Sequence, residues 1–582
     1  MALHDGITFG NHLIFTYGPL GFLSAPTLWY SDTGTIAVFY AVLLRLALAS
    51  ALFLGARRSY GTLAGAITAL IVASASSSVL ETVPFLIFCV WIVDHAPGSR
   101  LRPALMAISG AVAGVELLNK ASIGIEITAL AIVAAIAAPG RRRGHVITTL
   151  LALSLALLVA WTAAGQGWGA LPAYANGISQ IVGGYAAAMS VEAPTADWQL
   201  IAAWAAIAFG LAGAIHMTVD GPARRRWGIV FLWVVFCFFE FKGGFVRHDG
   251  GHVVNYFDAV MGGVLAMRWR RGSRLTGLTM LVALLAFAVA SEVGSLAAVF
   301  NFGGNASTAV SQLETVTSES DSNAITARGR EAIESAFPIP QATLNLLQGH
   351  TVHVALYQTS VAWAYRLDWQ PLPVFQSYSA YTTGLDQTDA SAINSAQAPQ
   401  RILLDLETEI DNRVPAFTEG LTTRTILCRY QQLYAGASGW QVLGLTPNRC
   451  GSPVYMETVH AAWNQTIRVP APPNDHSFVF VRIGGVGVEG LERIYALLYK
   501  PAERFVNLGG SRYRLVEETA SDGLLMRAAA GVDYPAPFNL APDKSTISVS
   551  KAGQGAGGGH PITFTFFAQS VNRGADAESA EG

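Results

Sequence analysis

Ionisable residues suited to acid–base chemistry and phosphate binding gather in a few short stretches of an otherwise apolar chain. The first stretch, HDGITFGNHLIFTYGPLGF, supplies Asp5 and Tyr17, and its GPLG segment favours a tight bend. Asp5 is the only carboxylate before Asp32. The sequence therefore predicts that the chain opens with a polar loop that takes part in chemistry.

The second stretch surrounds Lys120, one of only two lysines before Lys500. The segment GVELLNKASIGIEI places Glu116 and Glu126 near Lys120, and Glu81 opens an apolar segment further upstream. Ionisable groups at membrane depth are costly, and they pair, line a cavity or bind a ligand. We expect Lys120 and Glu81 to bind substrate. The alternative is a simple pairing of Lys120 with a glutamate across one helix turn.

The third stretch, FEFKGGFVRHDGGHVVNYF, is rich in both glycine and charge. Cations beside glycine-rich backbone suit a phosphate or pyrophosphate, and histidine adds a hydrogen-bond donor. The predicted substrate-binding residues are Lys242, Arg247, His248 and His252. A metal site that includes Asp249 is an alternative, but the spacing matches no strong ligand signature, so we assign no metal ligands. A solvated loop without function is the other alternative.

Helices that cross a membrane must position these stretches. Hydrophobic residues make up 52% of the 582 residues and charged residues only 13%, with a mean hydropathy of +0.39. About ten predominantly apolar segments are compatible with membrane spans. They are Gly34–Ala56, Gly61–Ser76, Val79–Asp94, Pro103–Leu118, Ser122–Ala138, Val146–Ala164, Trp198–Met217, Trp227–Phe239, Val253–Met267 and Leu275–Ser291.

The arginine clusters orient these predicted spans. Each cluster follows an odd-numbered span, as at Arg57–Arg58, Arg141–Arg143 and Arg224–Arg226. Positively charged short loops stay in the cytoplasm, so the three polar stretches and the C-terminal half are expected outside the plasma membrane. Met1 would then lie outside, and we expect a further helix upstream of it. The alternative is that a short N-terminus is translocated with the first span.

The sequence predicts a polytopic α-helical membrane protein with a C-terminal exterior region of α/β and β-sandwich type. An amphipathic helix between Gly165 and Asp197 is expected to lie in the outer interface, where it could cradle a lipid chain. Cys428 and Cys450 lie in the exterior half, where an oxidising environment favours a disulfide. The predicted parts are an exterior loop (1–33), a transmembrane domain (34–292), a connector (293–350), a small α/β domain (351–450), a β-sandwich (451–570) and a disordered tail (571–582).

The architecture resembles the GT-C superfamily of membrane glycosyltransferases. More closely, the segments FGNHLIFTYGPLGFL, FVRHDGGHV and FQSYSAYTTGLD look like those of a family of bacterial polytopic membrane proteins of uncharacterised function. The GT-C resemblance implies a polyprenyl-phosphate-linked sugar as donor and an acidic catalytic residue in the first exterior loop, here Asp5. It also implies cations that hold the lipid phosphate, here Lys242, Arg247 or His248, with Lys120 as a further candidate.

We therefore expect a glycosyltransferase that modifies an envelope glycan or glycoprotein on the outer face. A divalent metal is compatible with this chemistry, but no cofactor is specified by the residues. Two alternatives stay open: a non-catalytic membrane-anchored protein whose exterior domain binds glycan or a partner, and a transporter. The net charge of −2 does not bear on nucleic-acid binding, but no basic patch with interleaved aromatic residues appears outside the arginine loops, so we expect no nucleic-acid partner.

Overall fold

A computed structural model describes the chain in two compact units. Unit 1 comprises Met1–Phe15, Gly169–Ser190 and Arg328–Gly582, and unit 2 comprises Thr16–Trp168 and Val191–Ala327. The described residues are 1–75, 81–95, 101–191, 197–267, 278, 301–405, 410–411, 413–435, 439–529, 532, 545–553 and 560–572. The predicted opening loop is thus divided between the units, and the predicted tail, apart from Val571 and Asn572, lies outside the described residues.

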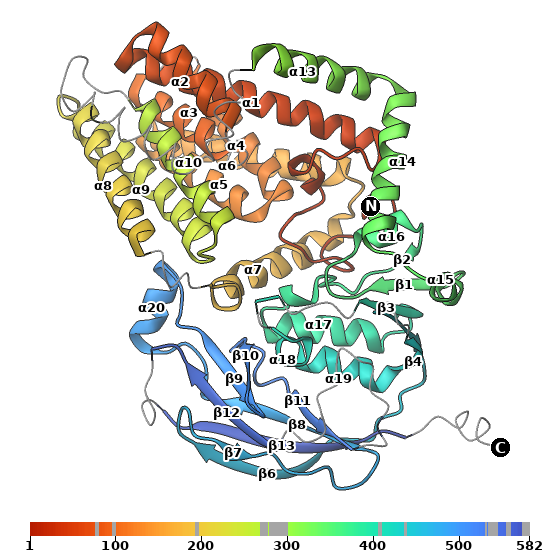
Figure 1. Ribbon diagram of the computed structural model, residues 1–582. Helices are drawn as coiled ribbons and strands as arrows, with labels where there is room; N and C mark the ends of the chain where they lie inside the picture. Colours follow the sequence, from red (N-terminus) through yellow and green to blue (C-terminus); the bar gives the residue numbers. More distant parts are fainter. Residues whose placement is uncertain are drawn as a thin grey trace. The chain divides into compact units, whose positions relative to one another are not determined.

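Unit 2 is built from long helices (Figure 1). They are α1 (Ser31–Tyr60), α2 (Thr62–Ala75), α3 (Thr82–His95), α4 (Arg102–Asn119), α5 (Ala121–Ala137), α6 (Arg142–Ala163), α8 (Asp197–Thr218), α9 (Ala223–Phe245), α10 (Gly250–Ala266) and α13 (Phe302–Thr317), with a 3-10 turn η1 (Gly21–Ser24) before α1. Helix α14 (Glu319–Ala336) leads into unit 1, and η2 (Trp168–Ala170) does so earlier in the chain. Each predicted span up to Val253–Met267 coincides with one of these helices, whereas Leu275–Ser291 lies outside the described residues.

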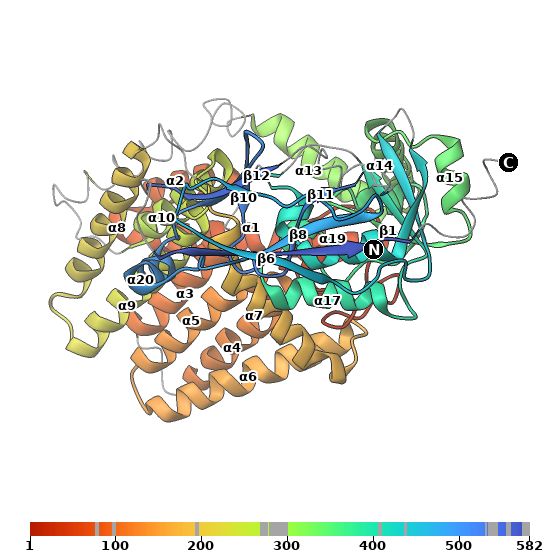
Figure 2. The ribbon, with the colours of Figure 1, turned by 90° about the horizontal axis from the view of Figure 1, so that it is seen from below.

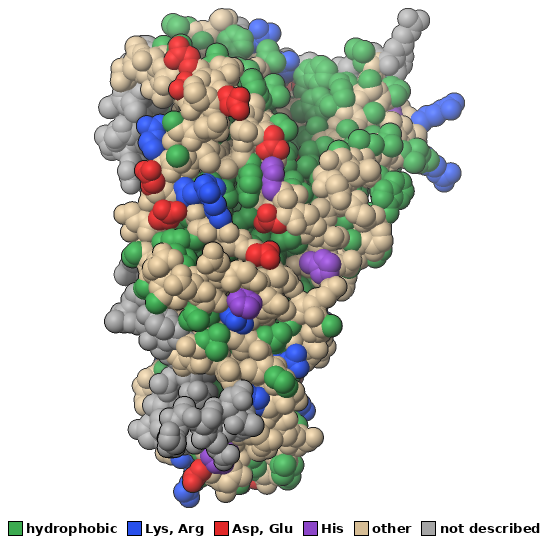
Figure 3. All heavy atoms as spheres, turned by 90° about the vertical axis from the view of Figure 1, so that its right-hand side faces the viewer, with side chains coloured by type: hydrophobic (Ala, Val, Ile, Leu, Met, Phe, Trp, Pro, Cys, Tyr) green, Lys and Arg blue, Asp and Glu red, His purple; other side chains and the backbone are tan. Residues whose placement is uncertain are grey.

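Four of the described helices, α1, α6, α8 and α9, are long and apolar enough to cross a membrane. Shorter apolar helices accompany them, so the prediction of about ten spans is supported in part. The long helices expose large apolar side chains, with 65% of Leu43, 66% of Leu151 and 71% of Ile201 accessible. Figure 3 shows apolar side chains gathered over the upper part of one face. Such extensive apolar surface is suited to contact with lipid.

Charged residues are sorted to opposite ends of the helices in unit 2. At one end, Arg225 pairs with Asp94 at the end of α3, and Arg102 donates to the carbonyl of Pro139 at 2.9 Å. The other end contains the Asn119–Lys120 turn between α4 and α5 and the start of α3. There Thr82, the first residue of α3, is hydrogen-bonded to Glu240 near the end of α9. Unit 2 therefore has an arginine end and an end that carries lysine and carboxylates, which we call the lysine end.

Helices α4 and α6 approach each other closely because α4 presents two glycines four residues apart. A Cβ atom on Gly110 would lie 2.1 Å from the carbonyl oxygen of Thr149, and one on Gly114 would lie 2.4 Å from that of Leu153. Small residues at this spacing let helix backbones pack directly, a common solution inside membranes. This contact fixes α4, whose last residues belong to the lysine end.

Unit 1 begins its C-terminal part with a five-stranded sheet in the order β2-β1-β3-β5-β4. Strands β1 (Thr351–Val354), β2 (Asp368–Trp369) and β3 (Arg401–Asp405) are parallel, while β5 (Trp440–Leu445) is antiparallel to β3 and to β4 (Tyr430–Ala435). Its helices are α15 (Gln341–Leu347), α16 (Ser360–Ala364), α17 (Thr383–Asn394), α18 (Pro415–Thr418) and α19 (Gly420–Arg429), with η3 (Ser377–Ser379). Cys428 and Cys450 form a disulfide that ties the end of α19 to the segment after β5.

Two antiparallel four-stranded sheets follow and enclose a common core. One has the order β10-β9-β12-β7 and the other β11-β8-β13-β6, whose strands run side by side in the view from below (Figure 2). The strands are β6 (Val454–Ala461), β7 (Ile467–Arg468), β8 (Ser477–Gly484), β9 (Arg504–Leu508), β10 (Ser511–Leu515), β11 (Leu524–Ala528), β12 (Thr546–Lys551) and β13 (Ile562–Ser570), with α20 (Gly490–Leu498) between β8 and β9. Val506 and Val549 from one sheet pack with Phe564 and Phe566 from the other. The C-terminal region is therefore β-rich, with alternating strands that bury one face.

The predicted amphipathic helix exists as α7 (Leu171–Ala188), but protein covers much of its apolar face. Ile181 and Ala188 pack with Tyr381 and Leu385 of unit 1, and a Cβ on Gly184 would lie 2.5 Å from Tyr381. Buried side chains recur every three or four residues along α7. The face that the sequence suggested for a lipid chain is instead largely a packing surface for unit 1.

Replacing Gly110 with alanine tests the contact between α4 and α6. We expect Gly110→Ala to lower the melting temperature of the purified chain, because the added methyl group clashes with the backbone at Thr149. Gly243→Ala is the matched control within α9, where nothing lies within 4 Å of the added Cβ. The control should be neutral or stabilising by up to about 1 kcal/mol. Equal melting temperatures for the two variants would contradict the close packing.

Candidate functional site

The opening chain lies against the turn between α4 and α5 and brings Tyr17 to Lys120. The N–H groups of Gly18 and Leu20 donate to the carbonyls of Asn119 at 3.1 Å and Leu118 at 2.9 Å. The ammonium group of Lys120 lies 5.1 Å from the centre of the Tyr17 ring, within the range of a cation–π interaction. Two predicted site residues from separate stretches are thus neighbours.

Carboxylates from different helices surround this lysine. Lys120 interacts electrostatically with Glu81, just before α3, and with Glu240 of α9. Thr82 donates its hydroxyl hydrogen to Glu240 at 2.6 Å, which holds α3 against α9. Glu126 of α5 interacts in turn with Glu240. Four helices therefore contribute to one polar group, which we call the carboxylate cluster: Glu81, Glu116, Glu126, Glu240 and Lys120.

Glu116 occupies a fixed position in the carboxylate cluster. It accepts hydrogen bonds from the Tyr40 hydroxyl of α1 and from the Asn119 side chain at 3.0 Å. Asn119 also accepts a hydrogen bond from Ser24 at 2.9 Å. Glu116, Glu126 and Glu240 are buried. Glu81 is partly exposed, so among the four glutamates it is the one accessible to a substrate.

The predicted pairing of Lys120 with a neighbouring glutamate across one helix turn is not what the structure describes. Glu116 is bound by Tyr40 and Asn119, while Glu126 interacts with Glu240. The electrostatic partners of Lys120 come from other helices instead. Lys120 therefore lies between helices, where its ammonium group can bind an anionic ligand.

The glycine-rich stretch forms the turn between α9 and α10. Asp249 caps α10 by accepting from the backbone N–H of His252 at 3.0 Å, and its carboxylate contacts Arg247 and the His252 ring, each at 2.8 Å. Burial raises the pKa of Asp249, but these hydrogen bonds outweigh it, and the net pKa lies below the usual range. Arg247 and His252 are thus held together by one carboxylate.

The other predicted residues of this stretch have different surroundings. His248 is buried, its Nε2 lies 2.8 Å from the side-chain oxygen of Gln199, and its ring contacts Phe245. Lys242 lies in the last turn of α9, with its ammonium group 6.0 Å from the Phe238 ring. His248 therefore braces α8 against the turn, while Lys242 is two residues beyond Glu240 of the carboxylate cluster.

Asp5 belongs to unit 1, whereas the other predicted substrate-binding residues belong to unit 2. Its backbone N–H donates to the carbonyl of Met1 at 3.0 Å in a turn. Partial burial raises the pKa of Asp5, while the positive charges of the N-terminal ammonium group and of His4 lower it by smaller amounts. The structure thus does not bring Asp5 together with Lys120 inside one compact unit.

Unit 1 contains a buried acidic group that the sequence analysis missed. Asp386 accepts from the N–H groups of Leu421 at 3.0 Å and Thr422 at 2.8 Å, which caps α19. Asp522 is hydrogen-bonded to Asp386, and burial together with the Asp386 charge raises the pKa of Asp522 to about 7. Asp389 accepts from the N–H of Val374 at 2.8 Å. These acids join α17 to neighbouring segments, and we assign them a structural role.

Three aromatic residues of the segment WQPLPVFQSYSAYTTGLD are likewise structural. Trp369, Phe375 and Tyr381 are buried, and the Trp369 and Phe375 rings meet edge to face at 5.9 Å. These three aromatic side chains therefore pack in the core of unit 1. Among the described residues, no group of three or more histidine, cysteine, aspartate or glutamate side chains is arranged to hold a metal ion.

The buried acids of unit 1 predict that its stability falls as pH rises. Burial raises the pKa of Asp389 to about 8, so its contribution is complete below the ordinary pKa near 4 and is lost as pH rises toward 8. Asp389→Asn keeps the acceptor for Val374 and removes the charge. At pH 9 we expect the free energy of unfolding of the variant to exceed that of the wild type by on the order of a few kcal/mol, so that the variant melts at the higher temperature. At pH 4, where the Asp389 contribution is nearly complete, the two chains should melt at similar temperatures. Thermal unfolding of both chains across this range is the measurement, and parallel pH profiles would contradict the prediction.

No protein-family model, no curated protein and no solved structure matches this chain. Function is therefore inferred from the chain's own geometry and chemistry.

Proposed function

We propose that the chain is a membrane-bound glycosyltransferase that moves a sugar from a polyprenyl-phosphate donor to a cell-envelope acceptor. The observation that carries this proposal is the carboxylate cluster at the lysine end of the apolar helices. A polyprenyl chain dissolves in the membrane and leaves its phosphate at the height of the helix ends. A lysine beside a partly exposed carboxylate offers that phosphate a cation and offers the acceptor a base.

The chemistry follows from the charges that develop during transfer. Glu81 accepts the proton of the acceptor hydroxyl group as its oxygen forms a bond to the sugar's anomeric carbon. The bond from that carbon to the phosphate oxygen breaks, and its electron pair leaves with the polyprenyl phosphate. Lys120 stabilises the negative charge of this leaving group. Tyr17 positions the ammonium group, and the hydrogen-bonded Glu116 and Glu240 hold the surrounding helices.

The resemblance to GT-C enzymes supports the same assignment and adds residues on the neighbouring turn. Lys242, Arg247 and His252 would extend the cationic surface toward a diphosphate or a larger headgroup. The resemblance also proposes Asp5 as the base, and the experiment below separates it from Glu81. A divalent metal stays compatible with the proposal, so the assay compares added magnesium or manganese with chelator.

The proposed orientation places the lysine end and unit 1 on the exterior side of the plasma membrane. Its support is the arginine end, since short loops rich in arginine are retained in the cytoplasm. The α/β and β-rich parts of unit 1 would then meet an envelope glycan or glycoprotein as acceptor. A disulfide between Cys428 and Cys450 suits an oxidising exterior.

Transfer of a labelled sugar from polyprenyl-phosphate donors to envelope fractions tests the proposal. We expect Glu81→Gln and Lys120→Met each to lower the transfer rate by about 100-fold or more, because each removes a group that acts on the developing charge. Asp220→Asn, on the exposed loop before α9, is the matched control and should keep the wild-type rate. All variants are compared at equal amounts of folded protein.

The outcomes distinguish the alternatives. Loss of activity in Asp5→Asn but not in Glu81→Gln would move the base to the opening loop. Wild-type protein without transfer, whose exterior part still binds envelope glycan, would favour the membrane-anchored binding protein. Wild-type rates in both Glu81→Gln and Lys120→Met would overturn the proposed site.

Transport is the second candidate, and Glu126 is the observation that favours it. Glu126 is buried within α5, and its Oε1 atom forms no hydrogen bond with any described residue. Buried carboxylates inside apolar helices often mark proton or ion pathways. The transporter interpretation predicts that proteoliposomes of the wild type carry a proton flux measurable with a pH-sensitive dye, and that Glu126→Gln abolishes it. Equal fluxes from wild type, variant and empty vesicles would remove this candidate.

A further inference from the structure

Helix α20 is an amphipathic helix with an uncovered apolar face. None of its residues is buried, although it lies between two strands of the β-rich part of unit 1. Its exposed apolar side chains are large, and 84% of Leu491 and 69% of Leu497 are accessible. The full set is Leu491, Ile494, Tyr495, Leu497 and Leu498. Such a concentration on one short helix indicates a binding surface.

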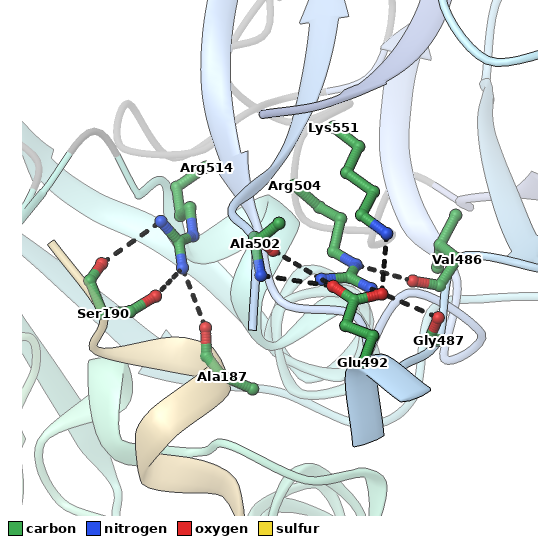
Figure 4. Close-up of polar contacts among 9 residues, drawn as sticks. All are labelled: Ala187, Ser190, Val486, Gly487, Glu492, Ala502, Arg504, Arg514 and Lys551. Atoms are coloured by element: carbon green, nitrogen blue, oxygen red, sulfur yellow. Dashed lines mark hydrogen bonds and ion pairs between the residues drawn. The ribbon is translucent and has the colours of Figure 1, made fainter. Parts of the chain in front are cut away.

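The opposite face of α20 is fixed to the sheet by an ion-pair network centred on the buried Arg504. Glu492 accepts from Arg504 at 3.1 and 3.2 Å and from Lys551 at 2.6 Å (Figure 4). Arg504, only 1% exposed, also donates to the carbonyls of Val486 at 2.9 Å and Gly487 at 3.3 Å. Arg504 thus holds both α20, through Glu492, and the loop before it, through Val486 and Gly487. Because of these bonds, α20 cannot rotate its apolar side chains toward the sheet.

The same end of the β9–β10 hairpin holds the end of α7. Arg514 of β10 donates to the carbonyls of Ala187 at 2.8 Å and Ser190 at 3.2 Å and to the Ser190 hydroxyl at 2.7 Å (Figure 4). Arg504 and Arg514 lie close together because Arg504 pairs with Leu515 across the hairpin. One end of the hairpin therefore carries both α20 and the point where α7 ends.

Only a short segment of chain separates the end of α7 from a candidate membrane span. The candidate span of α8 starts at Trp198, eight residues after Ser190. An extended chain reaches about 3.5 Å per residue, so these eight residues span at most roughly 28 Å. The segment that joins α6 to the start of α7 is equally short, because α6 ends at Ala163 and α7 begins at Leu171.

The composition of α20 matches the interface between lipid and water. Leucine and isoleucine suit the acyl boundary, and the rings of Tyr495 and Tyr499, which meet edge to face at 5.7 Å, suit the headgroup level. The charge of Glu492 is already neutralised by Arg504 and Lys551, while Arg493 is exposed and can meet lipid phosphate. A protein partner is not required to cover this face.

We infer that α20 is a membrane-binding helix that lies in the lipid interface of the leaflet facing unit 1. Together with α7 it fixes how unit 1 stands on the membrane. This role is independent of sugar transfer, and it applies whether the chain is an enzyme, a transporter or a binding protein.

A fluorescent probe on α20 tests the inference in the full chain. Leu497→Cys is labelled with the environment-sensitive dye NBD and reconstituted in vesicles of phosphatidylcholine and phosphatidylglycerol. Cys89 and Cys237 are buried, so labelled wild type gives the background. Val454→Cys on β6, where 64% of the side chain is exposed, is the matched control. We expect lipid carrying a shallow doxyl quencher to quench the Leu497→Cys probe several-fold more than the control probe.

Every other outcome overturns the inference. Equal quenching at the two positions would mean that α20 faces water. A blue-shifted probe that doxyl lipid does not quench would mean that protein covers the helix. A loss of probe quenching that appears only at a high protein-to-lipid ratio would mean that a second copy of the chain covers this face. Leu498→Cys repeats the measurement, so a local effect of one labelled position does not decide the result.

Discussion

The cost of holding charge among apolar helices is the constraint on which the rest of this structure depends. Unit 2 meets it by sorting charges to the two helix ends and by binding the carboxylates that lie deeper. Asp94 and the nearby backbone carbonyls receive arginines at one end, while Thr82, Tyr40 and Asn119 donate hydrogen bonds to glutamates at the other. Lys120 is the cation that the carboxylate cluster surrounds. The polar site is thus also what joins α1, α3, α4, α5 and α9.

A related constraint shapes unit 1, which is connected to the membrane helices at several points in the chain. Helix α7 lies in sequence between α6 and α8, yet it packs as part of unit 1. Arg514 secures the end of α7, and Arg504 secures α20 from the neighbouring strand. Buried guanidinium groups need several acceptors, and here backbone carbonyls supply many of them. The same requirement therefore places two amphipathic helices at one end of a β-hairpin.

Local patterns in the sequence predicted the elements well. The apolar segments marked the helices of unit 2, and the amphipathic pattern of the segment after Gly165 marked α7. These features depend on residues close together in the chain. Lys120 and Tyr17 were each singled out for chemistry, but the sequence did not predict that they are neighbours.

Local sequence patterns could not predict which distant segments contact one another. Glu240 appeared to belong to the glycine-rich stretch, but Thr82, far away in sequence, holds it in the carboxylate cluster. Asp386, Asp389 and Asp522 look like ordinary surface acids until α17 and the loop before β11 meet. The apolar face of α7 was read correctly as apolar, but periodicity alone does not tell whether lipid or protein covers it.

The most direct test of the central claim is to locate where a lipid phosphate binds. A polyprenyl phosphate with a diazirine beside the phosphate is irradiated with the purified chain, and the labelled peptides are identified by mass spectrometry. The account predicts labelling around Glu81, Asn119–Lys120 and the end of α9, with loss of labelling in Lys120→Met. Labelling confined to the arginine end, or labelling unchanged in Lys120→Met, would contradict it.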